Sequence, residues 1–196
     1  MDFPDNENAL QTLKEKIALG DQTAFRQLFN FYSKKLTRFA YSIVKSQDAA
    51  REIVDEVFIK IWRNRAKITG IQNLRVYLYT AAKNTGLNYL SARARENICE
   101  PFDFFNVQFS DEQSPEKRMI NSELMKKIND AINDLPPRCK MVFKLVREDG
   151  LSYKEVGEIL NISPKTVDAQ MVIAVKQITM KVRFDFDYLP KRHSGK

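Results

Sequence analysis

Near its C-terminus the chain carries polar side chains at a spacing that suits reading the edges of DNA bases. Residues 152–178 form two stretches of helical periodicity, SYKEVGEIL and PKTVDAQMVIAVKQI, separated by the short segment NIS. The residues expected to face inward are Val156, Ile159, Leu160, Val167, Met171 and Ala174. Those expected to face outward from the second helix are Lys165, Thr166, Asp168, Ala169, Gln170 and Ile173.

These outward side chains have matching partners on DNA. Gln170 can pair with an adenine edge, and Thr166 can reach a phosphate or a thymine methyl group. The pattern therefore predicts a helix-turn-helix whose second helix enters the major groove. The same spacing also fits a helical hairpin that has no role in DNA binding, and the motif alone leaves both interpretations open.

A second candidate for nucleic-acid chemistry is a basic stretch that contains no acidic residue. From Val57 to Arg95 there are eight Lys or Arg residues and no Asp or Glu. The tyrosines Tyr77, Tyr79 and Tyr89 are interleaved with these cations. Aromatic faces that stack on unpaired bases, beside cations that follow phosphates, are typical of single-strand binding. Some of these tyrosines are instead expected in the core, because the helix that carries them needs an inner face.

Catalytic and metal sites are not indicated by this sequence. His193 is the single histidine, and the two cysteines, Cys99 and Cys139, favour neither a disulfide framework nor a zinc site. Glu52 and Glu56 lie one helical turn apart and are better interpreted as a solvated or docking face than as a catalytic dyad. We expect no catalytic residue, no metal, no cofactor and no small-molecule substrate.

The distribution of charge points to a polyanionic partner more strongly than the total does. The chain of 196 residues has a formal net charge of +7. Directly after the basic stretch, residues 96–116 contain six acidic residues and no basic one. The acidic N-terminus MDFPDNEN lacks the apolar core of a signal peptide, and no apolar run reaches membrane-spanning length, so a soluble cytoplasmic protein is predicted.

Helical periodicity and capping residues predict an all-α fold of two small helical domains joined by an acidic linker. Helices are expected over 9–19, from the cap Asp21, from about Asp48, and from the cap Asn73 to about Arg95, with a loop at 66–72. Helicity resumes after Met119, breaks at Leu135-Pro136-Pro137, and restarts at caps Ser152 and Ser163. The predicted organisation is a domain at 1–95, a linker at 96–118, a helix-turn-helix domain at 119–183 and a disordered tail at 184–196.

Two blocks of sequence resemble one known family. AREIVDEVFIKIW followed by NLRVYLYTAAKNTGLNYL resembles the second conserved domain of extracytoplasmic-function (ECF) sigma factors. LPPRCKMVFKLVREDGLSYKEVGEILNISPKTVDAQMVIAVKQI resembles their fourth. The resemblance implies a bacterial subunit that binds RNA polymerase core, recognises the −10 and −35 promoter elements and helps to open DNA. It also implies an inhibitory anti-sigma partner.

The resemblance gives each group of residues a role. The clamp helices of the largest polymerase subunit would be gripped by Glu52, Asp55, Glu56 and Phe58. The loop from Lys67 to Asn73 would hold a base flipped out of the −10 element, and the next helix would face the opening duplex through Arg75, Lys83, Asn84 and Asn88. The −35 element would be read by the helix that starts at Ser163, through the outward residues named above. The acidic linker would thread toward the active-site and RNA-exit channels of the polymerase.

Some positions depart from the family's usual pattern, and other classes of protein remain open. Arg51, Asn88, Ser91 and Ile173 replace residue types that are common in the family, which affects the expected base preference. One alternative is a dimeric one-domain regulator that binds DNA without polymerase. Another is a protein that sequesters a second factor through its helices, although the acid-free basic stretch argues against it.

Overall fold

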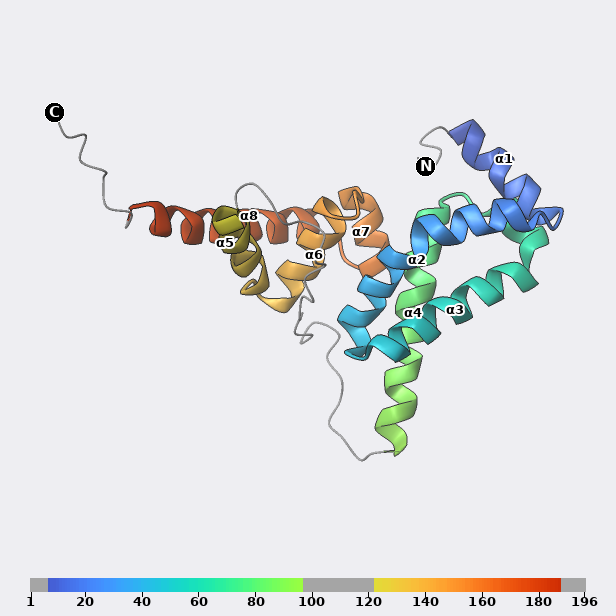
Figure 1. Cartoon of the computed structure of the whole chain (residues 1–196), viewed down its shortest axis with the longest axis horizontal. Helices are drawn as coiled ribbons and strands as arrows, with labels where there is room; N and C mark the ends of the chain where they lie inside the picture. Colours follow the sequence, from blue (N-terminus) through green and yellow to red (C-terminus); the bar gives the residue numbers. More distant parts are fainter. Residues whose placement is uncertain (1–6, 97–121, 188–196) are drawn as a thin grey trace. The chain divides into compact units, whose positions relative to one another are not determined.

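The computed structural model describes residues 7–96 and 122–187, and every regular element within them is a helix (Figure 1). This confirms the all-α prediction. The elements in chain order are α1 (Glu7–Ala18), α2 (Gln22–Val44), α3 (Gln47–Arg63), the 3₁₀-helix η1 (Arg65–Gly70), α4 (Leu74–Glu96), α5 (Ser122–Asn133), α6 (Pro137–Arg147), α7 (Tyr153–Leu160) and α8 (Pro164–Asp187). The chain forms two compact units: α1 to α4 build the first, and α5, α6, α8 and most of α7 build the second.

The N-terminal unit is held together by α2, which packs on both α3 and α4. Apolar residues recur along α2 at three- and four-residue steps, and Leu28, Leu36 and Ile43 are completely buried. Facing side chains from α3 and α4, including Val54 and Leu78, close the same core. Helix α1 lies against η1 and α2 at the edge of this bundle.

Side-chain caps determine where the helices of this unit begin. The Asp21 carboxylate accepts hydrogen bonds from the backbone N–H groups of Thr23 at 2.8 Å and Ala24 at 3.1 Å. Asn73 Oδ1 accepts one from the N–H of Val76 at 3.0 Å. Both predicted caps are confirmed. The third helix starts at Gln47, slightly earlier than predicted, because Ser46 caps it.

In the C-terminal unit, α5 and α6 pack on α8. Leu135, Cys139 and Ala174 form its buried centre, with Phe143 and Ile178 packed around them. The predicted break at the two prolines is confirmed, since α5 ends at Asn133 and Pro137 occupies the first turn of α6. Lys140 is buried, and its ammonium group donates to the carbonyl of Asn133 at 3.2 Å, at the end of α5.

Two sequence predictions about backbone structure were wrong. The segment 66–72 was predicted as a loop, but residues 65–70 form η1, in which the N–H of Ile71 bonds to the carbonyl of Ile68 at 3.2 Å. Helicity was predicted to end at Arg183, but α8 continues to Asp187, because no glycine or proline interrupts the chain there. Residues 97–121 and 188–196, which include most of the acidic linker and of the predicted tail, lie outside the described residues.

Candidate functional site

The turn between α7 and α8 is built by local hydrogen bonds. A capping box starts α7, because Ser152 Oγ accepts from the N–H of Glu155 at 3.2 Å while the Glu155 carboxylate accepts from the N–H of Ser152 at 2.9 Å. Asn161 ends α7 in the left-handed conformation with φ of 55°, as predicted. Ser163 Oγ then accepts from the N–H of Thr166 at 3.0 Å and starts α8.

Gly157 is a residue of this motif that sequence reasoning missed. The N–H of Ile162 bonds to the carbonyl of Gly157 at 2.9 Å, which folds the turn back onto α7. A Cβ atom at position 157 would lie 2.7 Å from the backbone oxygen of Ile162. Only glycine allows this close approach, and a glycine inside a short helix was the available signal.

The surface of α8 agrees with the helix-turn-helix prediction. Val167, Met171 and Ala174 are buried as expected. Of the residues predicted to face DNA from this helix, Thr166 and Gln170 are half-buried. The others are exposed: Lys165, Asp168, Ala169 and Ile173. The hydroxyl groups of Ser163 and Thr166 share a hydrogen bond of 2.8 Å, which orients the hydroxyl of Thr166 at the start of the helix.

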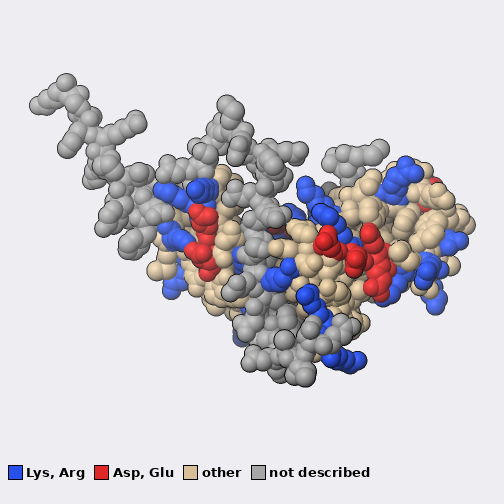
Figure 2. Space-filling view, turned by 60° about the horizontal axis from the view of Figure 1, so that its bottom comes forward, with Lys and Arg blue, Asp and Glu red and all other residues tan. Residues whose placement is uncertain are grey.

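On the N-terminal unit, α3 presents an acidic face to solvent. Glu52, Asp55 and Glu56 are all exposed, and Figure 2 shows carboxylate side chains gathered in a patch with basic side chains around it. Glu56 forms an ion pair with Lys60 at 2.5 Å. Within the described residues, Glu52 and Asp55 form no ion pair, so their negative charge is the part of this face that is available to a partner.

The prediction that Phe58 belongs to this face needs correction. Its side chain is only 3% exposed, and its ring packs against the rings of Phe25 and Phe29 at centroid distances of 6.0 and 4.9 Å. Phe58 therefore supports α3 from the core side. The apolar residue on the acidic face is its neighbour Ile59, which is 50% exposed and lies one turn after Asp55.

The segment Lys67–Asn73 (the loop), which comprises most of η1 and the three residues before α4, exposes polar groups around a buried side chain. Lys67, Gly70, Gln72 and Asn73 are exposed, whereas Ile68 is buried. On α4, Arg75 is half-buried. Asn84 and Asn88 are exposed one turn apart on the same helix, with Lys83 adjacent in sequence.

The three tyrosines of α4 have different environments. Tyr79 is buried with its ring 5.2 Å from that of Phe39, so it is a core residue. Tyr77 is 43% exposed and available for stacking, whereas Leu78 beside it is buried. Tyr89 is half-buried. The stacking hypothesis therefore applies to Tyr77 and not to Tyr79.

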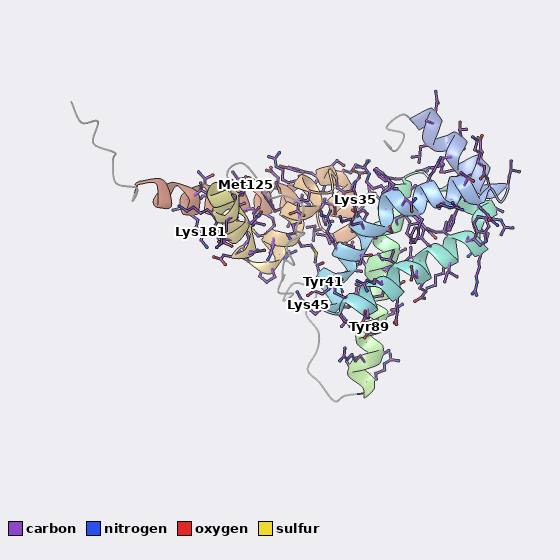
Figure 3. All side chains as sticks on the ribbon, in the orientation of Figure 1. Lys35, Tyr41, Lys45, Tyr89, Met125 and Lys181 are labelled. Atoms are coloured by element: carbon purple, nitrogen blue, oxygen red, sulfur yellow. The ribbon has the colours of Figure 1, made fainter. Side chains whose placement is uncertain are left out.

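A further cation of the N-terminal unit lies at the end of α2. Figure 3 shows Lys45 there, with Tyr41 on the preceding turn and Tyr89 on α4. Lys45 ends α2 in the left-handed conformation with φ of 58°, which is unusual for a lysine. Partial burial lowers the pKa of Lys45 to about 8.

Within residues 7–96 and 122–187, no group of three or more His, Cys, Asp or Glu side chains is placed to hold a metal ion. Among the same residues, no helix combines the length and the apolar character needed to cross a membrane.

Comparison with known proteins identifies both units. Residues 28–96 match the family model of sigma-70 region 2, and residues 125–178 match that of sigma-70 region 4. The ECF RNA polymerase sigma-E factor of Haemophilus influenzae is 31% identical over 180 residues, which is 88% of this chain and 95% of that protein. The chain belongs to the ECF sigma factors. The sigma-E factor of Escherichia coli K12 is also 31% identical and is covered to 94%.

Solved structures support the fold of this sigma factor. CnrH in complex with the cytosolic domain of CnrY is 18% identical, with a TM-score of 0.55 over 89% of this chain and 97% of that one. The sigma factor RpoE of Bartonella quintana, in complex with the anti-sigma factor NepR, is 19% identical with a TM-score of 0.58, over 82% and 98%. Both similarities confirm the predicted two-domain helical fold.

Membership of the family decides between the classes of protein that the sequence left open. Two sigma-70 regions in order are not expected in a one-domain regulator or in a protein that only sequesters another factor. This sigma factor serves promoter recognition and transcription initiation, and its family consists of regulatory DNA-recognition proteins.

Proposed function

We propose that this sigma factor divides initiation among three surfaces: α3 binds polymerase core, the loop and α4 open the −10 element, and α8 reads the −35 element. The observation that carries the proposal is the charge sorting on neighbouring elements of the N-terminal unit. Acidic residues lie on the exposed face of α3, whereas residues 57–95 contain eight basic residues and no acidic one. A protein partner and a polyanion can thus be bound by adjacent elements of one small bundle.

The polymerase surface comprises Glu52, Asp55, Glu56 and Ile59. Complementary charge brings a basic coiled coil to this face and sets its register. Ile59 supplies an apolar contact in the middle of the charged residues, which is where interface energy usually concentrates. The clamp helices of the largest polymerase subunit are the proposed partner.

For the −10 element, the proposed reader is the loop Lys67–Asn73 with Arg75, Lys83, Asn84 and Asn88 on α4. The cations neutralise phosphates, and the exposed amides and Tyr77 offer hydrogen bonds and a stacking face to unpaired bases. Capture of an extruded base offsets the few kcal/mol needed to unpair and unstack it. Binding energy alone therefore drives opening, and no covalent step is involved.

For the −35 element, the proposed reader is the first half of α8, from Ser163 to Ile173. Lys165 and Gln170 are the side chains best suited to phosphates and base edges. Asp168, Ala169 and Ile173 complete the exposed surface, and the apolar pair Val172–Ile173 can meet thymine methyl groups. This helix is held by the turn at Gly157 and by the Ser163 cap, so its position relative to α7 is fixed.

The proposed setting is the cytoplasm, with polymerase core, promoter DNA and an anti-sigma factor as partners. The sigma factor RpoE, which has a similar fold, is found in a complex with the anti-sigma factor NepR, and this supports the last of these. The proposed functional domains are residues 1–95 and 119–183. Residues 96–118 would tether them and thread through the polymerase.

Reconstituted transcription tests this proposal. Purified protein is added to RNA polymerase core, and run-off transcripts are mapped across genomic DNA fragments. Start sites that share two spaced upstream elements are the expected result. Binding to core without any new start site would contradict the assignment of DNA contacts, and absence of core binding would contradict the assignment of α3.

A further inference from the structure

Lys14 is a buried lysine whose ammonium group contacts the loop proposed to read the −10 element. Its side chain is 6% exposed, in the middle of α1. Lys14 Nζ donates to the backbone carbonyl of Ile71 at 2.9 Å, across 57 positions of sequence. Placing a lysine in a buried position is costly, and an apolar side chain of similar length would avoid that cost. Packing alone therefore does not explain why this position is a lysine.

The contact fixes Ile71, the first of the three residues that join η1 to α4. The N–H of Ile71 bonds to the carbonyl of Ile68, and its own carbonyl is bound by Lys14, so both sides of Ile71 are engaged. Ile68 is buried beneath the loop. The exposed residues Lys67 and Asn73 flank this fixed centre on either side.

Helix α1 lies outside residues 28–96, the segment that matches sigma-70 region 2. It packs on η1 as well as on α2, and its Lys14 reaches Ile71 directly after η1. We infer that Lys14 is a positioning residue for −10 recognition: through Ile71 it holds the loop Lys67–Asn73 in the shape that receives an extruded base. This inference rests on the proposed function of that loop.

The test compares Lys14→Met with Lys16→Met, which removes an exposed lysine from the same helix. Hydrogen exchange of the segment 66–76 in the free protein is expected to be faster in Lys14→Met only. With polymerase core, the ratio of run-off transcription between the preferred and singly substituted −10 elements should fall about tenfold, as expected for losing a hydrogen bond to a charged group. Core affinity and −35 discrimination should match those of Lys16→Met.

The conservative variant Lys14→Arg keeps a cationic donor and should restore most of the discrimination. If Lys14→Met melts below the assay temperature, Lys14→Gln takes its place with the same expected results. Unchanged −10 discrimination, or an equal loss at the −10 and −35 elements, would overturn the inference.

The variant Lys67→Ala in the loop distinguishes failure of this inference from failure of the proposed function on which it rests. If Lys67→Ala alters −10 discrimination and Lys14→Met does not, the positioning role is wrong and the loop assignment stands. If neither variant alters it, the loop is not the reader and both are overturned. Loss of discrimination in both, with faster exchange only in Lys14→Met, supports the inference.

Discussion

Both helical units contain a buried lysine, but the two lysines bind different kinds of segment. Each buries a lysine whose ammonium group donates to a backbone carbonyl: Lys14 to Ile71 at 2.9 Å and Lys140 to Asn133 at 3.2 Å. Lys14 crosses 57 positions of sequence to reach a connecting segment, whereas Lys140 crosses 7 to reach the end of the preceding helix. Lys14 thus ties a distant helix to the proposed −10 reader, whereas Lys140 fixes only the junction between α5 and α6.

The exposed surfaces of the two units also differ in their charge and apolar character. On α3, carboxylates and one apolar side chain, Ile59, form a surface suited to a basic protein. On α8, the apolar pair Val172 and Ile173 is exposed at 61% and 41%, with Asp168 and Lys176 one turn to either side of Val172. Under the proposed function, long-range steering would come from the N-terminal unit, and short-range readout from the C-terminal one.

The pair of variants with the largest expected effect tests which of two adjacent residues, Phe58 or Ile59, belongs to the polymerase surface. Phe58→Ala removes a buried ring and should lower the free energy of unfolding by about 3–5 kcal/mol. Ile59→Gln should leave that free energy nearly unchanged but weaken core binding about tenfold, because roughly half of the side chain is available for burial. Thermal melts and core-binding titrations measure the two effects. A stable Phe58→Ala variant that has lost only core affinity would place Phe58 on the polymerase surface.

Charge reversal on α3 tests the steering role of the N-terminal unit. Glu52→Lys with Asp55→Lys replaces the two carboxylates that form no ion pair among the described residues. Core affinity should fall about a hundredfold, since attraction becomes repulsion at a complementary surface. Glu15→Lys, at an exposed position of α1, is the control and should bind normally. Equal weakening in the control would indicate a general effect of net charge.

Gly157→Ala tests whether the C-terminal unit depends on its tight turn. Helix propensity alone predicts stabilisation by roughly 1 kcal/mol. The contact with Ile162 O predicts the opposite, a loss of about 1–3 kcal/mol from overpacking, together with weaker −35 recognition. Glu158→Ala, at the next and exposed position, should change stability little. A higher melting temperature for Gly157→Ala would show that the turn adapts.

The variant with the smallest expected effect tests whether −35 recognition and DNA opening belong to different units. Gln170→Ala should reduce discrimination at one −35 position about tenfold, the value of a good side-chain contact to a base edge. Gln177→Ala, an exposed glutamine two turns later on α8, is the matched control. DNA opening, measured by reactivity of unpaired thymines at saturating protein, should be unaffected in both. Loss of opening in Gln170→Ala would contradict the assignment of opening to the N-terminal unit alone.

What the sequence by itself determined is local. Asp21, Asn73, Ser152 and Ser163 were found as caps because such a side chain bonds to backbone groups two or three residues away. The inward face of the helix-turn-helix followed from helical spacing for the same reason, and so did the left-handed turn at Asn161.

Only the tertiary structure decided the choices that depend on distant partners. Phe58 and Ile59 are adjacent apolar residues, and the position of Phe25 and Phe29 on α2 determines which one is buried. The same holds for Tyr77 and Tyr79, since Phe39 covers only the latter. The segment after α3 forms η1 where α1 packs on it and Lys14 reaches Ile71. Periodicity reports that a face is apolar, but which neighbour covers it is set by packing between elements far apart in the chain.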